Sequence, residues 1–415
     1  MTATTTFEIR AQQLDANDPC AMYRDWFHVP ENKVYLDGNS LGLMPKSCVQ
    51  RISVVAQSEW SEGLIASWTR AQWFDLPLKV GDRLAPLLGV GRGEVVVGDS
   101  TSVNLFKCMA AALHLRPERK VILAESDNFP TDSYMAQGLA NLIDAVEVKY
   151  FDAETDPAAL ADNAAVVVLS HIHYRNARVR DMAQVTKAIQ AKGALVLWDL
   201  SHTTGAFDCQ LNQVNADMAV GCTYKYLNGG PGAPAFTWIN KQHMTDLVQP
   251  LSGWMGHASP FDFDREYVAA NGPRRLLCGT PQVLSLSAVD EALKLWTEVD
   301  LNALWEKRQL MSSLFIDAVE SLCDSHDLQL ESPREPRYRG SHVAFFMAEH
   351  GYEVMQALIA RGVVGDFRAP GTLRFGFAPL YLRYRDVLAA VQNLAAVLDH
   401  QEWNKPQFRN RSVVT

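Results

Sequence analysis

Short runs of small and branched apolar residues recur between residues 94 and 239 of this chain, which has 415 residues. Segments of helical period, such as residues 103–115 and 182–192, fill several of the gaps between them. The runs lie at residues 94–97, 121–124, 146–151, 165–170, 194–200, 218–222 and 235–239. Such runs are typical of strands buried on both faces, and they predict a mostly parallel sheet covered by helices.

The pattern changes toward both ends of the chain. Residues 1–45 are largely polar, and two long helical stretches after residue 280 lead into strand patterns at 342–347 and 373–377. Because the chain is longer than one core usually supports, we expect an α/β fold with more than one domain. The expected parts are an N-terminal segment (1–45) that packs on the small domain, a large domain (46–280) and a smaller C-terminal α+β domain (281–415).

The composition argues against several classes of partner. The net charge is −9 and no block is rich in lysine or arginine, so neither nucleic acid nor an anionic membrane surface is expected. No apolar run approaches the roughly 18 residues of a membrane span, and the N-terminus lacks the apolar core of a signal peptide. Seven scattered cysteines without a C-x-x-C pair disfavour a disulfide framework and a zinc site. We therefore expect a cytoplasmic protein without a metal site.

Two short motifs point to a particular chemistry. Asp199 ends one apolar run, and Lys225 lies between two tyrosines just before the glycine-rich stretch 228–232. Taken singly, the lysine reads as a surface charge and the aspartate as a helix cap. Together they match what pyridoxal 5'-phosphate (PLP) requires, namely an amine that links to its aldehyde and a carboxylate that keeps its ring nitrogen protonated. The pair therefore predicts a PLP site.

Hydroxyl side chains supply a candidate for the phosphate. Thr101 and Ser102 open the helical segment that follows the first apolar run, where hydroxyls and free N–H groups form an anion cradle. An ordinary helix cap would need only one such residue. Ser170 ends another apolar run, and ligands bind at the carboxyl ends of strands in parallel sheets.

Other candidates carry weaker signals. Phe129 and Asp132 offer an aromatic face and an acid after the run 121–124, and His202 follows Asp199 by three residues. A satisfied core histidine is an equally good interpretation of His202. Arg374 lies on a predicted strand, where its planar guanidinium suits the carboxylate of an amino acid, with a structural ion pair as the alternative.

Three runs carry a resemblance to a known family. Residues 198–202, 224–232 and 253–257 closely resemble the kynureninase family, and the likeness extends from residues 36–42 to residues 374–381. The family belongs to the fold-type I, aminotransferase class V group of PLP enzymes. The resemblance therefore implies a large PLP-binding domain with a smaller C-terminal domain, and hydrolysis of L-kynurenine to anthranilate and L-alanine by Cβ–Cγ cleavage in tryptophan degradation.

The resemblance also implies roles for individual residues. Lys225 would hold the cofactor, Asp199 would pair with its ring nitrogen, and Tyr224 would reach the phosphate and is a candidate acid. Phe129 would lie over the ring. Further cofactor contacts are implied for Thr101, Ser102, Thr131, Asp132, Ser170 and His202.

Three more positions are matched by the family. Trp254 and Thr280 correspond to cofactor-binding residues that the neighbouring subunit contributes to the active site, which implies a homodimer with shared active sites. Arg374 corresponds to the arginine that holds the substrate carboxylate. Members that favour 3-hydroxykynurenine carry asparagine where this chain has Thr280, so we expect a preference for unsubstituted kynurenine, with 3-hydroxykynurenine as a second candidate substrate.

Two alternatives stay open at this point. Another class V activity, an aminotransferase or a cysteine desulfurase, is one of them, and a desulfurase would have Cys278 as its candidate nucleophile. A non-catalytic protein with the same fold is the other. The presence of Asp199, Lys225 and Arg374 together disfavours that second alternative.

Overall fold

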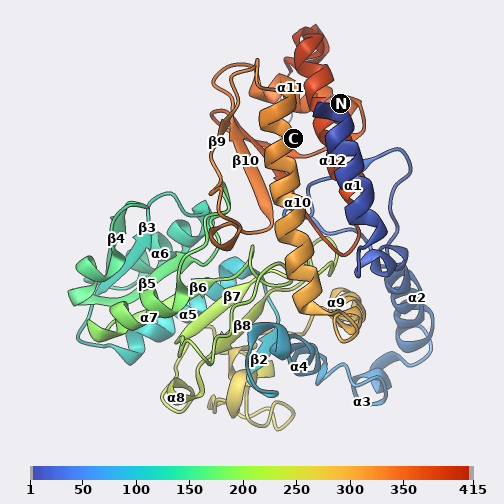
Figure 1. Ribbon diagram of the computed structural model, residues 1–415. Helices are drawn as coiled ribbons and strands as arrows, with labels where there is room; N and C mark the ends of the chain where they lie inside the picture. The colour runs from blue at the N-terminus through green and yellow to red at the C-terminus, as the bar shows by residue number, and fades with distance from the viewer. Residues whose placement is uncertain (1–2, 411–415) are drawn as a thin grey trace. The chain divides into compact units, whose positions relative to one another are not determined.

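The computed structural model describes residues 3–410, which form two compact units (Figure 1). The central unit comprises Ser47–Tyr174 and Arg180–Leu295. Of the described residues, the terminal unit combines 3–46, Arg175–Val179 and 296–410.

A seven-stranded sheet forms the core of the central unit, with strand order β2-β8-β7-β6-β5-β3-β4. The strands are β2 (Val95–Val97), β3 (Val121–Glu125), β4 (Glu147–Phe151), β5 (Ala164–Ser170), β6 (Leu195–Asp199), β7 (Met218–Gly221) and β8 (Phe236–Ile239). Only β8 runs antiparallel to its neighbours among the described strands of this sheet. The predicted mostly parallel sheet is therefore confirmed.

Helices cover this sheet because their apolar residues pack against buried strands. Helix α5 packs on β5 and β7, and α6 packs on β3 and β4. The helices of the unit are α2 (Lys46–Val54), α3 (Ser67–Arg70), α4 (Leu76–Leu88), α5 (Thr101–Leu115), α6 (Pro130–Leu142), α7 (Met182–Ala191), α8 (Lys241–Met244) and α9 (Val283–Leu295). Short helical turns join them, among them η2 (Val55–Trp60), η3 (Leu64–Ala66), η4 (Pro157–Asn163), η5 (Trp254–Gly256) and η6 (Gly272–Leu276).

The terminal unit has an antiparallel sheet of four strands in the order β12-β13-β10-β9. These are β9 (Gln329–Leu330), β10 (His342–Phe346), β12 (Asp366–Arg368) and β13 (Thr372–Gly376). A separate parallel pair joins β1 (Val34–Tyr35) to β11 (Val363–Val364). The smaller C-terminal domain predicted as α+β thus has both element types.

Three helices of the terminal unit lie side by side, as Figure 1 shows: α1 (Ala3–Ala16), α10 (Leu301–Leu322) and α12 (Tyr384–Asp399). The remaining helices are α11 (Gly351–Ala360) and the turns η1 (Ala21–Trp26), η7 (Pro336–Tyr338), η8 (Glu402–Asn404) and η9 (Pro406–Phe408). No described helix of the chain combines the length and the apolar character that crossing a bilayer would require.

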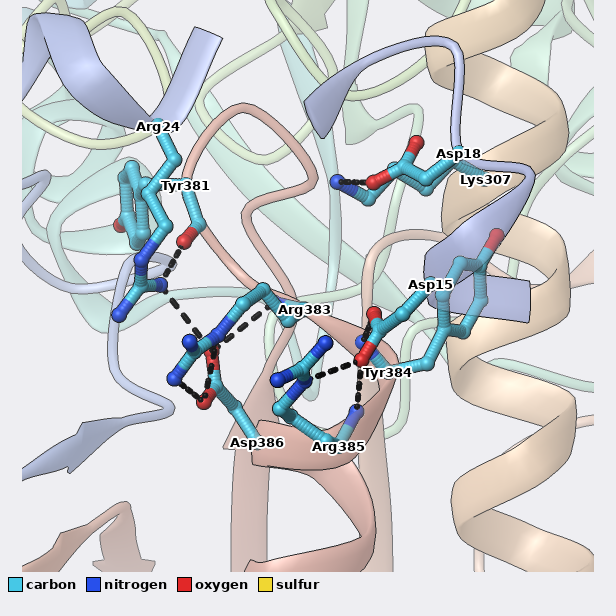
Figure 2. Close-up of polar contacts among 9 residues, drawn as sticks. All are labelled: Asp15, Asp18, Arg24, Lys307, Tyr381, Arg383, Tyr384, Arg385 and Asp386. Atoms are coloured by element: carbon cyan, nitrogen blue, oxygen red, sulfur yellow. Dashed lines mark hydrogen bonds and ion pairs between the residues drawn. The ribbon is translucent and has the colours of Figure 1, made fainter. Parts of the chain in front are cut away.

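Ion pairs hold the N-terminal residues to the start of α12 (Figure 2). Asp15 accepts hydrogen bonds from the Tyr384 backbone N–H at 2.8 Å and from Arg385 Nε at 2.6 Å. Arg24 Nη1 donates to Asp386 Oδ2 at 3.0 Å. These segments are far apart in the sequence, so the side-chain pairs and the packing of α1 on α12 are what hold them together within the unit.

Candidate functional site

The carboxyl edge of the central sheet carries the first two candidates. Ser170 ends β5 and Asp199 ends β6, and the two residues are direct partners in the strand register. Asp199 is 6% exposed, and its Oδ1 accepts a hydrogen bond of 2.7 Å from the Ser201 backbone N–H. The strand-end location predicted for both residues is confirmed.

Lys225 follows β7 in a tightly closed loop. The Gly229 backbone N–H donates to the Thr223 carbonyl at 2.9 Å, and a Cβ at Gly229 would lie only 2.8 Å from that same oxygen. The glycine is therefore required by a close backbone approach. The loop brings Lys225 Nζ to 2.9 Å from Nε2 of the buried His202.

Two buried carboxyl groups face the same lysine. Burial, followed by the charge of Asp199, raises the pKa of Asp132 well above its ordinary value, and the Lys225 charge opposes this. Burial likewise raises the pKa of Asp199, against hydrogen bonds from Ser201 and the charge of Lys225. A positively charged group brought beside these two acids would favour their ionised forms and lower both pKa values. Such a pocket suits a ligand that brings a protonated nitrogen.

Asn128 is a residue of this cluster that the sequence did not single out. It is buried, its Nδ2 donates to Asp132 Oδ2 at 2.7 Å, and its Oδ1 accepts from Ser170 Oγ at 2.6 Å. The other oxygen, Asp132 Oδ1, is buried and has no hydrogen-bond partner within residues 3–410. Its position directly before Phe129, a predicted cofactor contact, is the one feature of the sequence that could have indicated a role for Asn128.

The predicted phosphate cradle is assembled from two helix starts. Ser102 in the first turn of α5 and Thr131 in the first turn of α6 place their hydroxyl oxygens 2.6 Å apart. Thr101 is the first residue of α5, and Ser100 caps that helix by accepting from the Val103 backbone N–H at 3.3 Å. Hydroxyls and helix-terminal N–H groups thus converge in a way that fits a phosphate group.

Aromatic groups accompany this cluster. Phe129 directly precedes α6 and is 44% exposed, with its ring edge-on to Tyr174 at 5.5 Å between centroids. The Cys222 thiol, then burial and the Asp199 charge, raise the pKa of the Tyr224 hydroxyl. Tyr224 therefore stays a neutral hydroxyl that can donate a proton.

Trp254 and Thr280 lie on neighbouring segments of the central unit. The Met255 backbone N–H donates to the Cys278 carbonyl at 3.3 Å, and Gly253 touches the same residue so closely that a Cβ would clash. Trp254 is 39% exposed and Thr280 is exposed as well. Burial raises the pKa of the Cys278 thiol, which disfavours the thiolate that a desulfurase nucleophile requires.

Arg374 lies on β13 of the terminal unit and is 2% exposed. Its Nε donates to Asp366 Oδ1 at 2.8 Å and its Nη2 to Asp366 Oδ2, while Ser40 Oγ accepts from Nη2 at 3.1 Å. With its side-chain amide turned, Asn39 accepts from Arg374 Nε at 3.0 Å. The ion pair raised as the alternative for Arg374 thus exists, and a role toward substrate stays a prediction.

The cluster around Lys225 has what a PLP site needs. It joins an amine, two buried acids, a histidine and a group of hydroxyls at helix starts, within the central unit alone. The roles of these residues toward the cofactor stay predictions.

Comparison of the sequence with known proteins identifies the family of this chain. Residues 304–394 match the family model described as the kynureninase C-terminal domain. The chain is 48% identical over 411 residues to the kynureninase of Burkholderia pseudomallei strain 1106a, covering 98% of this chain and 99% of that protein. It is 46% identical over 409 residues to the kynureninase of Pseudomonas fluorescens, covering 97% and 98% respectively.

Solved structures share the fold at much lower identity. A cysteine desulfurase from Escherichia coli superposes with a TM-score of 0.75 at 19% identity, covering 92% of this chain and 98% of its own. A C-DES variant with glycine covalently linked to its PLP cofactor gives 0.78 at 16% identity, covering 90% and 98%. At these identities the likeness establishes the fold alone, which is that of PLP fold-type I enzymes. The relatives that match at almost half identity over nearly the full length decide the family: this chain belongs to the kynureninases.

Proposed function

We propose that this chain hydrolyses L-kynurenine to anthranilate and L-alanine, with pyridoxal 5'-phosphate as cofactor, in tryptophan degradation in the cytoplasm. The observation that carries the proposal is the 48% identity to a kynureninase over 98% of the chain. The charge pattern around Lys225 supports it independently. When bound, PLP supplies an electron sink for negative charge that develops on the substrate's α- and β-carbons.

Four residues of the central unit have separate roles in proton transfer. Asp199 would keep a proton at the cofactor's ring nitrogen, because a cation beside a buried carboxyl group favours its ionised form and the two charges stabilise each other. The Lys225 amine takes the proton from the substrate's α-carbon. Its neighbour His202 Nε2, at 2.9 Å, accepts or donates a proton at Lys225 Nζ. The neutral Tyr224 hydroxyl is the candidate donor to the β-carbon after anthranilate has left.

Binding and orientation fall to other side chains. The hydroxyls of Thr101, Ser102 and Thr131 would hold the phosphate, and the half-exposed ring of Phe129 would cover one face of the cofactor. Asp132 and Ser170, linked through Asn128, would complete the contacts around the ring. Arg374 would hold the substrate's carboxylate, as the resemblance to the kynureninase family implies.

The activity can be tested with the purified protein. In the presence of PLP, we expect L-kynurenine to produce the fluorescence of anthranilate together with one equivalent of L-alanine. The same assay with 3-hydroxykynurenine tests the substrate preference inferred from Thr280, and a lower kcat/KM is expected for it. Turnover of cysteine to sulfide, or transamination without anthranilate, would instead support the alternative class V activities.

A homodimer with shared active sites is the second part of the proposal. Large apolar side chains gather on residues 49–65 of the central unit at exposures that a solvated surface rarely carries. They are Val49 (54%), Ile52 (41%), Val54 (41%), Trp60 (59%), Leu64 (60%) and Ile65 (81%). Thr280 lines a depression together with Trp60 and Trp73. A second copy of the chain would bury this surface, and Thr280 of each subunit would then reach the active site of the other.

Mixing two inactive variants tests the sharing directly. In a heterodimer of Lys225→Ala and Trp254→Ala, one site would combine Lys225 from one subunit with Trp254 from its partner, while the other site carries both defects. After unfolding and joint refolding, random pairing predicts recovery of about a quarter of wild-type activity. Each variant refolded alone is the control. If the mixture is no more active than the two variants apart, the sites are not shared between subunits.

A further inference from the structure

Lys107 is a buried cation outside the cofactor cluster described above. It lies on α5 and is 1% exposed. Its Nζ donates to Asp99 Oδ2 at 2.5 Å and to the Leu276 carbonyl at 2.6 Å. A lysine is rarely buried to this degree without a specific counter-charge, and Asp99 supplies it here. The question is what this buried ion pair does for the protein.

Asp99 lies in the turn that leads from β2 into the cradle. It has a left-handed backbone conformation, with φ of +54°, and it directly precedes Ser100, the cap of α5. Its backbone is held on both sides, because the Ala235 N–H donates to the Asp99 carbonyl at 2.9 Å and the Gly98 N–H donates to the Ala235 carbonyl at 2.8 Å. The carboxylate is thus kept near the N-terminus of α5.

This placement creates a charge conflict. The first turn of α5 is where Thr101 and Ser102 would receive the cofactor's phosphate, and a phosphate monoester carries close to two negative charges near neutral pH. A carboxylate within the preceding two residues repels that phosphate, unless a cation neutralises it.

We propose that Lys107 is a positioning residue for the cofactor: by neutralising Asp99, it lets the start of α5 accept the phosphate dianion. The inference rests on the proposed PLP function. Through its second bond, to the Leu276 carbonyl, Lys107 also ties the cradle to the segment that leads to Thr280. A merely structural ion pair would stabilise the fold but would not distinguish a cofactor with a phosphate from one without it.

Affinity for PLP and for pyridoxal, which lacks the phosphate, separates these roles. The full-length protein, freed of cofactor, is titrated with each compound, and binding is followed by absorbance. Wild-type protein should prefer PLP. In Lys107→Met, this preference should fall by about tenfold or more, the scale expected for one uncompensated unit charge near a phosphate in a partly buried site. Pyridoxal affinity should change little.

The double variant is the matched control. In Lys107→Met with Asp99→Asn, no carboxylate is left without its counter-charge, so the preference for PLP should return to within about threefold of wild type. Equal losses for PLP and pyridoxal in Lys107→Met, or no recovery in the double variant, would overturn the proposal. If Lys107→Met does not fold, the double variant decides alone: it should fold and keep the preference, and its failure to do either counts against the proposal. Wild-type protein that binds neither compound would refute the PLP function itself.

Discussion

Replacing Lys225 with alanine is expected to lower turnover of L-kynurenine by at least about a thousandfold, within the range that loss of a general base produces. The amine provides both the covalent attachment of the cofactor and the base for the α-carbon proton. Anthranilate fluorescence measures the loss. In parallel, borohydride treatment of wild-type protein with PLP should label the peptide that contains Lys225, as read by mass spectrometry, and the variant should stay unlabelled.

A lysine elsewhere on the same unit serves as the control. Lys241 is exposed at the start of α8, and Lys241→Ala should keep both turnover and labelling at wild-type levels. Turnover by Lys225→Ala within tenfold of wild type would refute the assignment of this amine. So would a borohydride label on a different lysine.

Asp199→Asn is expected to keep PLP bound but to lower kcat by about a hundredfold or more, a loss of roughly 2.7 kcal/mol or more in transition-state stabilisation. The neutral amide cannot hold a proton at the ring nitrogen, so the electron sink weakens. Asp162→Asn is the control, because that carboxylate is 67% exposed and pairs only at the surface with Lys192. A kcat within tenfold of wild type would contradict the role given to Asp199.

Asp199→Asn should also change how the thermal stability of the cofactor-free protein depends on pH. Because burial raises the pKa of Asp199, its ionised form destabilises the folded state. Below the ordinary carboxyl pKa of about 4, both folded and unfolded chains hold the proton and no penalty exists. The penalty appears as the pH rises from there through the raised value. Asp199→Asn should therefore raise the midpoint of thermal unfolding more at pH 8 than at pH 4, and an equal effect at both would contradict the shift.

Local sequence was sufficient for the sheet and for the residues around Lys225. Each predicted strand from 94–97 to 235–239 overlaps an observed one, since near-continuous valine and leucine have few stable arrangements other than a covered sheet. Asp199 and Ser170 were found because strand ends are visible in the apolar pattern.

Contacts between distant residues were beyond that reasoning. Asn128 gives no signal of its own, and only the fold brings it between Ser170 and Asp132. The pairing of Arg374 with Asp366, and of Lys107 with Asp99, depends on how a strand or a helix is packed. Charge alone could not select these partners from the 47 acidic residues of the chain.

The parallel pair of β1 and β11 has a consequence for synthesis on the ribosome. Val34 pairs with Val363, so the first strand to emerge must wait for almost the entire polypeptide before its partner exists. Pairing over such a separation is entropically costly and slow. The central unit can collapse on the nascent chain, whereas the terminal unit can close only after elongation has nearly finished, so until then its segments depend on chaperones for protection.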